Sequence, residues 1–166
     1  TTEGAGWIDA AAARAKAIVD DFDGRIVVGH TDWSADQIRT NNGKVSVVYD
    51  WDSLRPEKEA VVLGIAASNF TATWSLGVPN PPTPEETQLF VEDYEAARGE
   101  SFSGAERKAI AAAAIYAIAY ISRCEHAVDV EGEDLQGSFR DALPHHKEAY
   151  LKSVNSTLRS PSTHEE

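Results

Sequence analysis

The chain has 166 residues, and its 27 acidic and 15 basic side chains give a formal net charge of −12 at pH 7. This length is sufficient for one domain with a hydrophobic core, so we expect a single domain over residues 1–166 with a frayed tail over 160–166. A surface with this much negative charge repels nucleic acid and anionic membrane, and we expect neither as a partner. It is compatible with a cationic small molecule. The one cysteine, Cys124, excludes an internal disulfide and fits a cytoplasmic protein.

The first part of the chain predicts a helix followed by a small β-unit. Apolar side chains recur at helical spacing over residues 7–22, and Gly24 ends that pattern. Asn42 and Gly43 tolerate a positive φ, so the sequence around them predicts a β-hairpin. Short runs of apolar and β-branched residues supply the strands, namely residues 25–29, 37–40 and 44–49.

A second helix and a long loop are predicted next. Residues 56–70 return to a helical pattern, and Pro56 suits the first turn of that helix. Four prolines in residues 77–84 exclude a regular element there, so we expect a loop. Thr83 followed by Glu86 is a capping-box pattern, because each side chain can bond the backbone N–H of the other residue. Another helix should therefore follow Thr83.

The C-terminal half predicts helices only. Ser103 and Glu106 repeat the capping-box pattern, and every side chain from residue 109 to 121 is apolar. This alanine-rich run is too short to span a bilayer and predicts a buried central helix. One or two more helices are expected over residues 137–158, interrupted near Pro144. The predicted fold class is therefore mainly α, of the α+β type.

Side chains with oxygen ligands gather on the predicted β-unit. Asp32 follows the first strand, Gln37 lies where the hairpin begins, and Asp50 follows its second strand. Folding of the hairpin brings Gln37 and Asp50 together at its open end, and the loop with Asp32 enters beside them. Phosphoryl transfer from ATP requires a carboxylate near the acceptor hydroxyl and oxygen ligands for magnesium. These three side chains suit both requirements.

The segments GHTDWSADQI and VSVVYDWD resemble the catalytic segment of the aminoglycoside phosphotransferase family, which is related to choline kinases and protein kinases. In that family the loop has the pattern His-x-Asp-x-x-x-x-Asn, and a second Asp follows a hairpin just before a Trp. The matching positions are His30, Asp32, Gln37, Asp50 and Trp51. The resemblance covers most of the chain. It implies the helical C-terminal lobe of a protein-kinase-like fold, with a small β-hairpin that carries the catalytic loop.

The resemblance implies a role for each matching residue. Asp32 would be the catalytic base or the carboxylate that orients the hydroxyl, and His30 would brace the catalytic loop. Asp50 would be the principal magnesium ligand, with Gln37 at the second ligand position. Gln stands where the family has Asn, so its longer side chain can bind metal only if the loop adjusts. The implied cofactors are ATP and magnesium, and the implied substrate is a small molecule that accepts phosphate on a hydroxyl.

The resemblance also suggests where an acceptor would bind. The family holds cationic sugars with carboxylates of the C-terminal lobe, and acidic side chains of this chain lie at comparable places. The candidates are Asp52, Glu57, Glu92, Asp93 and Glu125.

The family has an N-terminal nucleotide-binding lobe in addition. The residues before 25 contain neither a glycine-rich phosphate loop nor a strand lysine with a helix glutamate. We therefore expect the chain to be a C-terminal lobe with little or no kinase activity by itself. Its expected partners are the missing lobe, or a second copy that self-associates through the apolar surface such a lobe would cover.

Two other interpretations stay open. A degenerate kinase-like lobe could serve as a non-catalytic binding or assembly module, which the substitution at Gln37 favours. A metal hydrolase would need Cys124 or His126 to join Asp32 and Asp50 around zinc, and zinc sites require three or four ligands.

Overall fold

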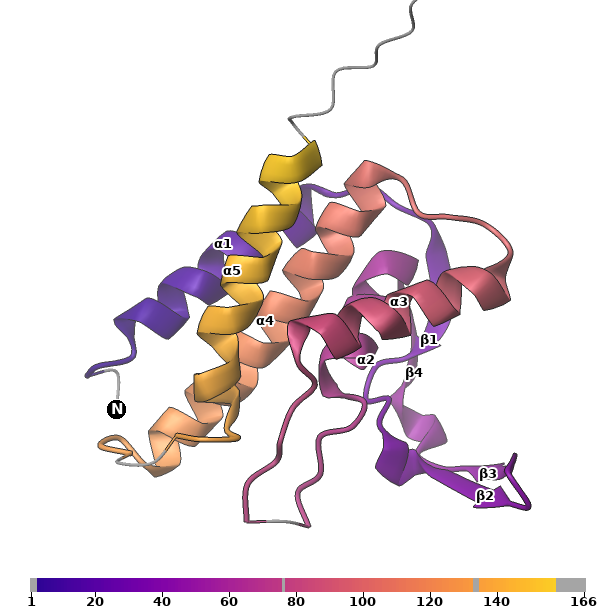
Figure 1. Ribbon diagram of the computed structural model, residues 1–166, viewed down its shortest axis with the longest axis horizontal. Helices are drawn as coiled ribbons and strands as arrows, with labels where there is room; N and C mark the ends of the chain where they lie inside the picture. Colours follow the sequence, from indigo (N-terminus) through magenta and orange to yellow (C-terminus); the bar gives the residue numbers. More distant parts are fainter. Residues whose placement is uncertain (1–2, 76, 133–134, 158–166) are drawn as a thin grey trace, which may run out of the picture.

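The computed structural model describes residues 3–75, 77–132 and 135–157, and the predicted frayed tail over 160–166 lies outside them. Within these residues the fold is mixed α+β and mostly helical (Figure 1). The helices of the described part are α1 (Gly6–Asp21), α2 (Glu59–Asn69), α3 (Pro84–Arg98), α4 (Gly104–Val128) and α5 (Phe139–Thr157). Its strands are β1 (Ile26–His30), β2 (Ile38–Asn41), β3 (Lys44–Val48) and β4 (Leu54–Lys58), with short 3-10 turns at Ala35–Gln37 and Trp51–Ser53.

Helix α4 forms the centre of the helical body and packs against α1, α2 and α5 (Figure 1). Its alanine-rich stretch is buried, with Ala109 and Ile118 fully inaccessible to solvent, so the predicted buried central helix is confirmed. Small side chains let α2 approach closely, because a Cβ added at Gly64 would meet the backbone of α4 at Ile110. No helix in the described ranges has the length and apolar character needed to cross a membrane.

Both predicted capping boxes are present. The Oγ1 of Thr83 accepts the backbone N–H of Glu86 at 3.2 Å, and the Glu86 carboxylate accepts the N–H of Thr83 at 2.8 Å. Ser103 and Glu106 make the same reciprocal pair at the start of α4. These bonds satisfy backbone donors that a helix otherwise leaves free at its first turn. They therefore fix where α3 and α4 begin.

The β-unit consists of two separate antiparallel ribbons. β1 pairs with β4, with Val28 opposite Pro56, and β2 pairs with β3. Asn42 and Gly43 have φ values of 50° and 73°, so the predicted hairpin turn is confirmed. The β1–β4 ribbon lies against α2, and the β2–β3 hairpin projects from the body (Figure 1).

The prediction that a helix begins at Pro56 is wrong. Residues 54–58 form strand β4, and α2 begins only at Glu59. Pairing with β1 outweighs the local helical pattern, and proline is tolerated here because a two-stranded ribbon has open edges.

The predicted interruption near Pro144 is also wrong, because α5 continues through that residue. Phe139 and Leu143 before the proline have no accessible surface, and His146 after it is also buried. The helix is thus held on both sides of the proline, by the core cluster that joins Leu143 to Ile118 of α4 and by the bond from His146 to the carbonyl of Pro82. This burial offsets the hydrogen bond that proline cannot donate.

A buried ion pair anchors the β1–β4 ribbon to the helical body. Glu59, directly after β4, is 6% exposed and lies 3.4 Å from the Nη2 of Arg98 at the end of α3. Its other carboxylate oxygen accepts the hydroxyl of Tyr94 at 2.9 Å. The Arg98 guanidinium also covers the ring of Phe102, 4.3 Å from the ring centroid. Removal of the Arg98 charge would leave the buried Glu59 carboxylate with only the more distant, exposed Arg25 as a charged partner, so the junction holds β4 in place.

Candidate active site

The ring of His30 links the two chain segments that carry the predicted acids. Its Nδ1 accepts the backbone N–H of Asp32 at 3.3 Å, and its Nε2 lies 3.3 Å from the carbonyl oxygen of Tyr49. Because Nδ1 accepts, the ring proton sits on Nε2, which donates to Tyr49. Trp33 contacts the ring, with the centroids 5.2 Å apart and the planes at 69°. His30 therefore joins the backbone at Asp32 to the backbone at Tyr49.

The backbone of Tyr49 is the point where the site segments meet. Its N–H donates to the carbonyl of Gln37 at 2.9 Å, and its carbonyl faces His30. Asp50 is the next residue along the chain. The backbone segments that carry Asp32, Gln37 and Asp50 are therefore joined through Tyr49. The side chain of Asp32 is exposed, and those of Gln37 and Asp50 are half-buried.

Asp50 has an unusual backbone conformation, with φ 64° and ψ 42° in the left-handed region. This region costs an L-residue about 1–2 kcal/mol, although Asp is among the residues that tolerate it best. The Oδ2 of Asp50 accepts the hydroxyl of Ser53 at 2.9 Å, and no described residue bonds its Oδ1. Strained residues of this kind cluster at functional sites, so the conformation marks Asp50 as a functional candidate.

Three polar residues of the site escaped sequence reasoning because strand β4 was not predicted. The N–H and the Oγ1 of Thr31 both donate to the carbonyl of Ser53, at 3.1 and 3.0 Å. The Nε of Arg55 donates to the same Oγ1 at 2.9 Å, which places a positive charge beside the loop that carries Asp32. Residues 54–58 contain no β-branched side chain, so the local sequence carried no strand signal for them.

Two side-chain oxygen atoms of the site are of the type that magnesium binds. The unbonded Oδ1 of Asp50 and the amide oxygen of Gln37 are hard oxygen ligands of the kind that magnesium prefers. Within the described ranges, no group of three or more His, Cys, Asp or Glu side chains is arranged to hold a metal.

Glu125, a predicted acceptor-binding residue, has its carboxylate bonded to the N-terminus of α5. Its two oxygens accept the backbone N–H groups of Phe139 and Arg140, each at 3.0 Å. A carboxylate at this place satisfies free donors of the first helical turn and complements the helix dipole. The structure therefore gives Glu125 a helix-capping contact.

The other acceptor-binding candidates lie on different elements. Asp52 is exposed in the turn directly after Asp50, whereas the Oε1 of Glu57 accepts the N–H of Lys58 at 2.7 Å. On α3, Glu92 accepts a side-chain N–H of Gln88 at 2.9 Å, and its neighbour Asp93 is exposed. Among these side chains, Asp52 is the nearest along the chain to the site.

The groups needed for a zinc hydrolase form no metal-binding cluster among the described residues. Cys124 is an exposed free thiol, and the Nε2 of His126 lies 2.7 Å from the carbonyl oxygen of Glu3. His126 thus fastens the N-terminal segment to the end of α4. The geometry of the described residues gives the hydrolase interpretation no support.

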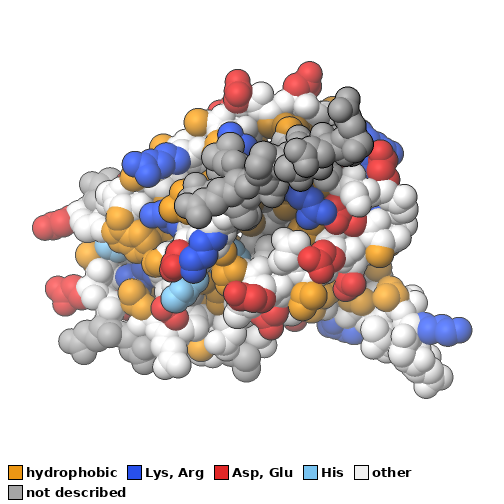
Figure 2. Space-filling model, turned by 45° about the horizontal axis from the view of Figure 1, so that its top comes forward, with side chains coloured by type: hydrophobic (Ala, Val, Ile, Leu, Met, Phe, Trp, Pro, Cys, Tyr) orange, Lys and Arg blue, Asp and Glu red, His pale blue; other side chains and the backbone are white. Residues whose placement is uncertain are grey.

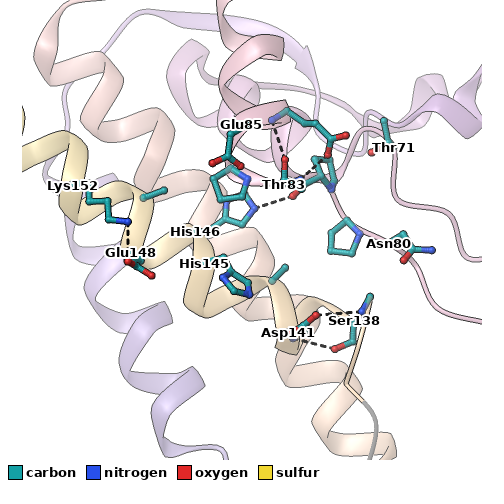
Figure 3. Close-up of a pocket in the computed structure, with 17 residues that line it drawn as sticks. Thr71, Asn80, Thr83, Glu85, Ser138, Asp141, His145, His146, Glu148 and Lys152 are labelled. Atoms are coloured by element: carbon teal, nitrogen blue, oxygen red, sulfur yellow. Dashed lines mark hydrogen bonds and ion pairs between the residues drawn. The ribbon is translucent and has the colours of Figure 1, made fainter.

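A concave region lies between the proline-rich loop, the start of α3 and α5 (Figure 3). It has a volume of about 740 Å³, and its lining includes no residue of the β-unit. Its wall contains His146, whose Nε2 donates to the carbonyl of Pro82 at 2.9 Å. Burial lowers the pKa of this histidine. Glu148 pairs with Lys152 across the rim, so several of the polar groups in this groove already bind one another.

Surface charge does not mark a further site on the face drawn in Figure 2. Acidic and basic side chains are interspersed there and do not gather in one patch.

Comparisons of the chain with protein-family models, curated proteins and solved structures find no match.

Proposed function

We propose that this chain is the catalytic and acceptor-binding lobe of an ATP-dependent small-molecule phosphotransferase in the cytoplasm, with a protein-kinase-like fold. The observation that carries the proposal is the His30 bridge. One imidazole bonds the backbone at Asp32 and at Tyr49, and Tyr49 in turn bonds Gln37 and precedes Asp50. This bridge supports a site in which a carboxylate for the acceptor hydroxyl lies beside two oxygen ligands for a metal.

Asp32 suits the part of the catalytic carboxylate. Its side chain is exposed, and among the described residues no hydrogen bond occupies its carboxylate. The loop that carries it is nevertheless fixed, because His30 holds its backbone N–H and Thr31 is bonded to Ser53. A free carboxylate on a fixed loop can accept the proton of an acceptor hydroxyl and orient its oxygen. Phosphoryl transfer depends mainly on such positioning and on electrostatic stabilisation.

Magnesium and ATP would be held by different parts of the site. Asp50 would bind the metal through Oδ1, with Gln37 as a second ligand, and the metal would neutralise negative charge on the phosphates. The guanidinium of Arg55, bonded to Thr31, would add positive charge beside the same loop. These residues would orient the reacting groups. The base and sugar of the nucleotide would need a binding surface formed by other residues.

The acceptor is proposed to be a small molecule with a hydroxyl group, and the acidity of the chain is compatible with a cationic one. Asp52 is the best placed of the predicted carboxylates, because it is exposed and lies two residues from Asp50. Glu125 is the worst placed, because both of its oxygens bind backbone N–H groups of α5.

A second candidate function is a non-catalytic kinase-like module that binds another protein surface. The observation that favours it is the exposure of several apolar side chains on the β-unit. Ile26 and Val28 of β1 are 61% and 70% exposed, and Trp51 is 61% exposed. Large exposed apolar areas are typical of surfaces that another chain covers.

The test is phosphoryl transfer by the full-length polypeptide from ATP and magnesium to a panel of amino-alcohols and amino-sugars. For an accepted substrate, Asp32→Ala should lower kcat by about 10²–10⁴-fold, the range expected for a positioned proton acceptor. Asp23→Ala is the matched control, because Asp23 is an exposed loop residue before β1. Full turnover by Asp32→Ala would remove that residue from the catalytic role. Failure of the wild type on every acceptor would favour the non-catalytic module.

A further inference from the structure

The geometry points to Ser53 as a positioning residue that fixes the Asp50 carboxylate for metal binding. This inference rests on the proposed function, because it takes Asp50 as the metal ligand. It adds a residue that was not among the predicted site residues, and it also connects the metal ligand to the loop of the catalytic carboxylate.

The first support is the double link between Ser53 and Asp50. The Oγ of Ser53 donates to the Oδ2 of Asp50 at 2.9 Å, and the N–H of Ser53 donates to the carbonyl of Asp50 at 3.1 Å. The side chain and the backbone of Asp50 are therefore bonded to the same residue. A carboxylate with one oxygen bonded has its rotation about χ2 restricted. Its other oxygen, Oδ1, is left for a cation.

The second support is the conformation of Asp50. A residue at φ 64° does not stay there without surrounding bonds that hold it. The short 3-10 turn from Trp51 to Ser53 supplies such bonds, because the N–H of Ser53 closes the turn on the Asp50 carbonyl. Ser53 thus holds the backbone of the strained residue in addition to its carboxylate.

The third support is the connection from Ser53 to the loop of Asp32. The carbonyl of Ser53 accepts both the N–H and the Oγ1–H of Thr31, and Thr31 immediately precedes Asp32. Arg55 completes the connection, because its Nε donates to the Oγ1 of Thr31 at 2.9 Å. Any shift of Ser53 would therefore move the metal ligand relative to the catalytic carboxylate. Bonds of this kind around ligating carboxylates orient the ligand and tune its affinity.

The experiment is a Mn²⁺ titration of the purified chain, followed through paramagnetic broadening of backbone amide signals in an ¹H–¹⁵N NMR spectrum. Broadening should centre on the residues around Asp50, and Asp50→Asn should abolish it. Ser53→Ala should weaken the apparent Mn²⁺ affinity by about tenfold or more, as loss of an outer-shell bond does. Ser53→Thr keeps the hydroxyl and should restore the affinity. Ser46→Ala is the matched control, because the hydroxyl of Ser46 donates only to the carbonyl of Arg39 on the hairpin.

The outcomes separate this inference from the proposed function. If Asp50→Asn abolishes the broadening while Ser53→Ala binds Mn²⁺ like the wild type, Ser53 has no positioning role and the metal site stands. If Asp50→Asn leaves the broadening unchanged, the proposed metal site itself is overturned. If Ser53→Ala loses its dispersed spectrum, Ser53→Cys replaces it, because a thiol of similar size is a weaker donor and should give an intermediate affinity. Wild-type affinity in Ser53→Cys would then count against the positioning role.

Discussion

The close contact between α2 and α4 makes a quantitative prediction for Gly64→Ala. A Cβ built at Gly64 overlaps the backbone oxygen of Ile110 and lies 2.8 Å from the Cβ of Ala113. Carbon atoms prefer separations of about 3.5–4.0 Å, so the two helices would have to move apart by roughly 1 Å. Backbone atoms cannot rotate away as a long side chain does. The cost should therefore reach the upper part of the usual overpacking range, about 3 kcal/mol.

A gain in helix propensity opposes this cost. Replacement of a mid-helix Gly by Ala stabilises a helix by about 1 kcal/mol, which leaves a net loss near 2 kcal/mol in the free energy of unfolding. For a chain of this length, that loss corresponds to a Tm decrease of about 4–8 °C. Urea denaturation and a thermal scan followed by circular dichroism would measure both quantities.

Gly104→Ala is the matched control, because nothing lies within 4 Å of a Cβ at the first residue of α4. It should change the free energy of unfolding by no more than about 0.5 kcal/mol. A Gly64→Ala protein as stable as the wild type would show that α2 and α4 are not as close as described. The reasoning from helix contact would then be refuted.

Three further predictions concern side chains whose contacts are defined above. Glu125→Gln should lower the free energy of unfolding by about 1–2 kcal/mol in urea denaturation, because a neutral amide keeps only one acceptor for the two N–H groups of α5. The control is Glu131→Gln, since Glu131 is exposed. A loss in Glu125→Gln no larger than that of the control would contradict the capping contact. Burial lowers the pKa of His146 from its ordinary value of 6.5, so the unfolded chain binds the proton more readily than the folded chain. The buried neutral histidine therefore contributes its full stability above about pH 6.5, and this contribution is lost as the pH falls below that value. Denaturation curves between pH 5 and 8 should show a weaker pH dependence for His146→Gln, whose side chain can still donate to Pro82, and an unchanged slope would count against the shift. Asp50→Gly should leave the free energy of unfolding within about 0.5 kcal/mol of the wild type, because glycine adopts the left-handed conformation without strain and this gain compensates for the lost Ser53 bond. A loss above about 1 kcal/mol would show that Asp50 is retained for stability.

Much of the helical framework could be predicted because its signals are local. The capping boxes at Thr83 and Ser103 join residues three positions apart, so the sequence displays them directly. The hairpin turn at Asn42 and Gly43 is equally local. The meeting of Gln37 with the residues before Asp50 followed from that hairpin, since the two segments are adjacent strands.

The features that escaped prediction depend on contacts between distant residues. Strand β4 exists because it pairs with β1, and Pro56 within it gave a misleading helical signal. Ser53 and Thr31 therefore could not be connected from the sequence. Glu125 was grouped with acceptor carboxylates because nothing in the sequence places it against the start of α5. The continuity of α5 through Pro144 likewise follows from burial against α4, which outweighs the local effect of proline.

The residues of the site lie close together in the sequence, which affects how the site folds and which substitutions elsewhere leave it unchanged. The bonds that join His30 to Tyr49 and Thr31 to Ser53 close chain loops within residues 26–58, so the entropy lost on closing these loops is small and the contact order of the site is low. The two ribbons can therefore form early and dock onto α2 as a preassembled unit. Helices α3 and α5 lie outside that unit, so substitutions on their surfaces can alter the groove between them while the acids keep their mutual arrangement.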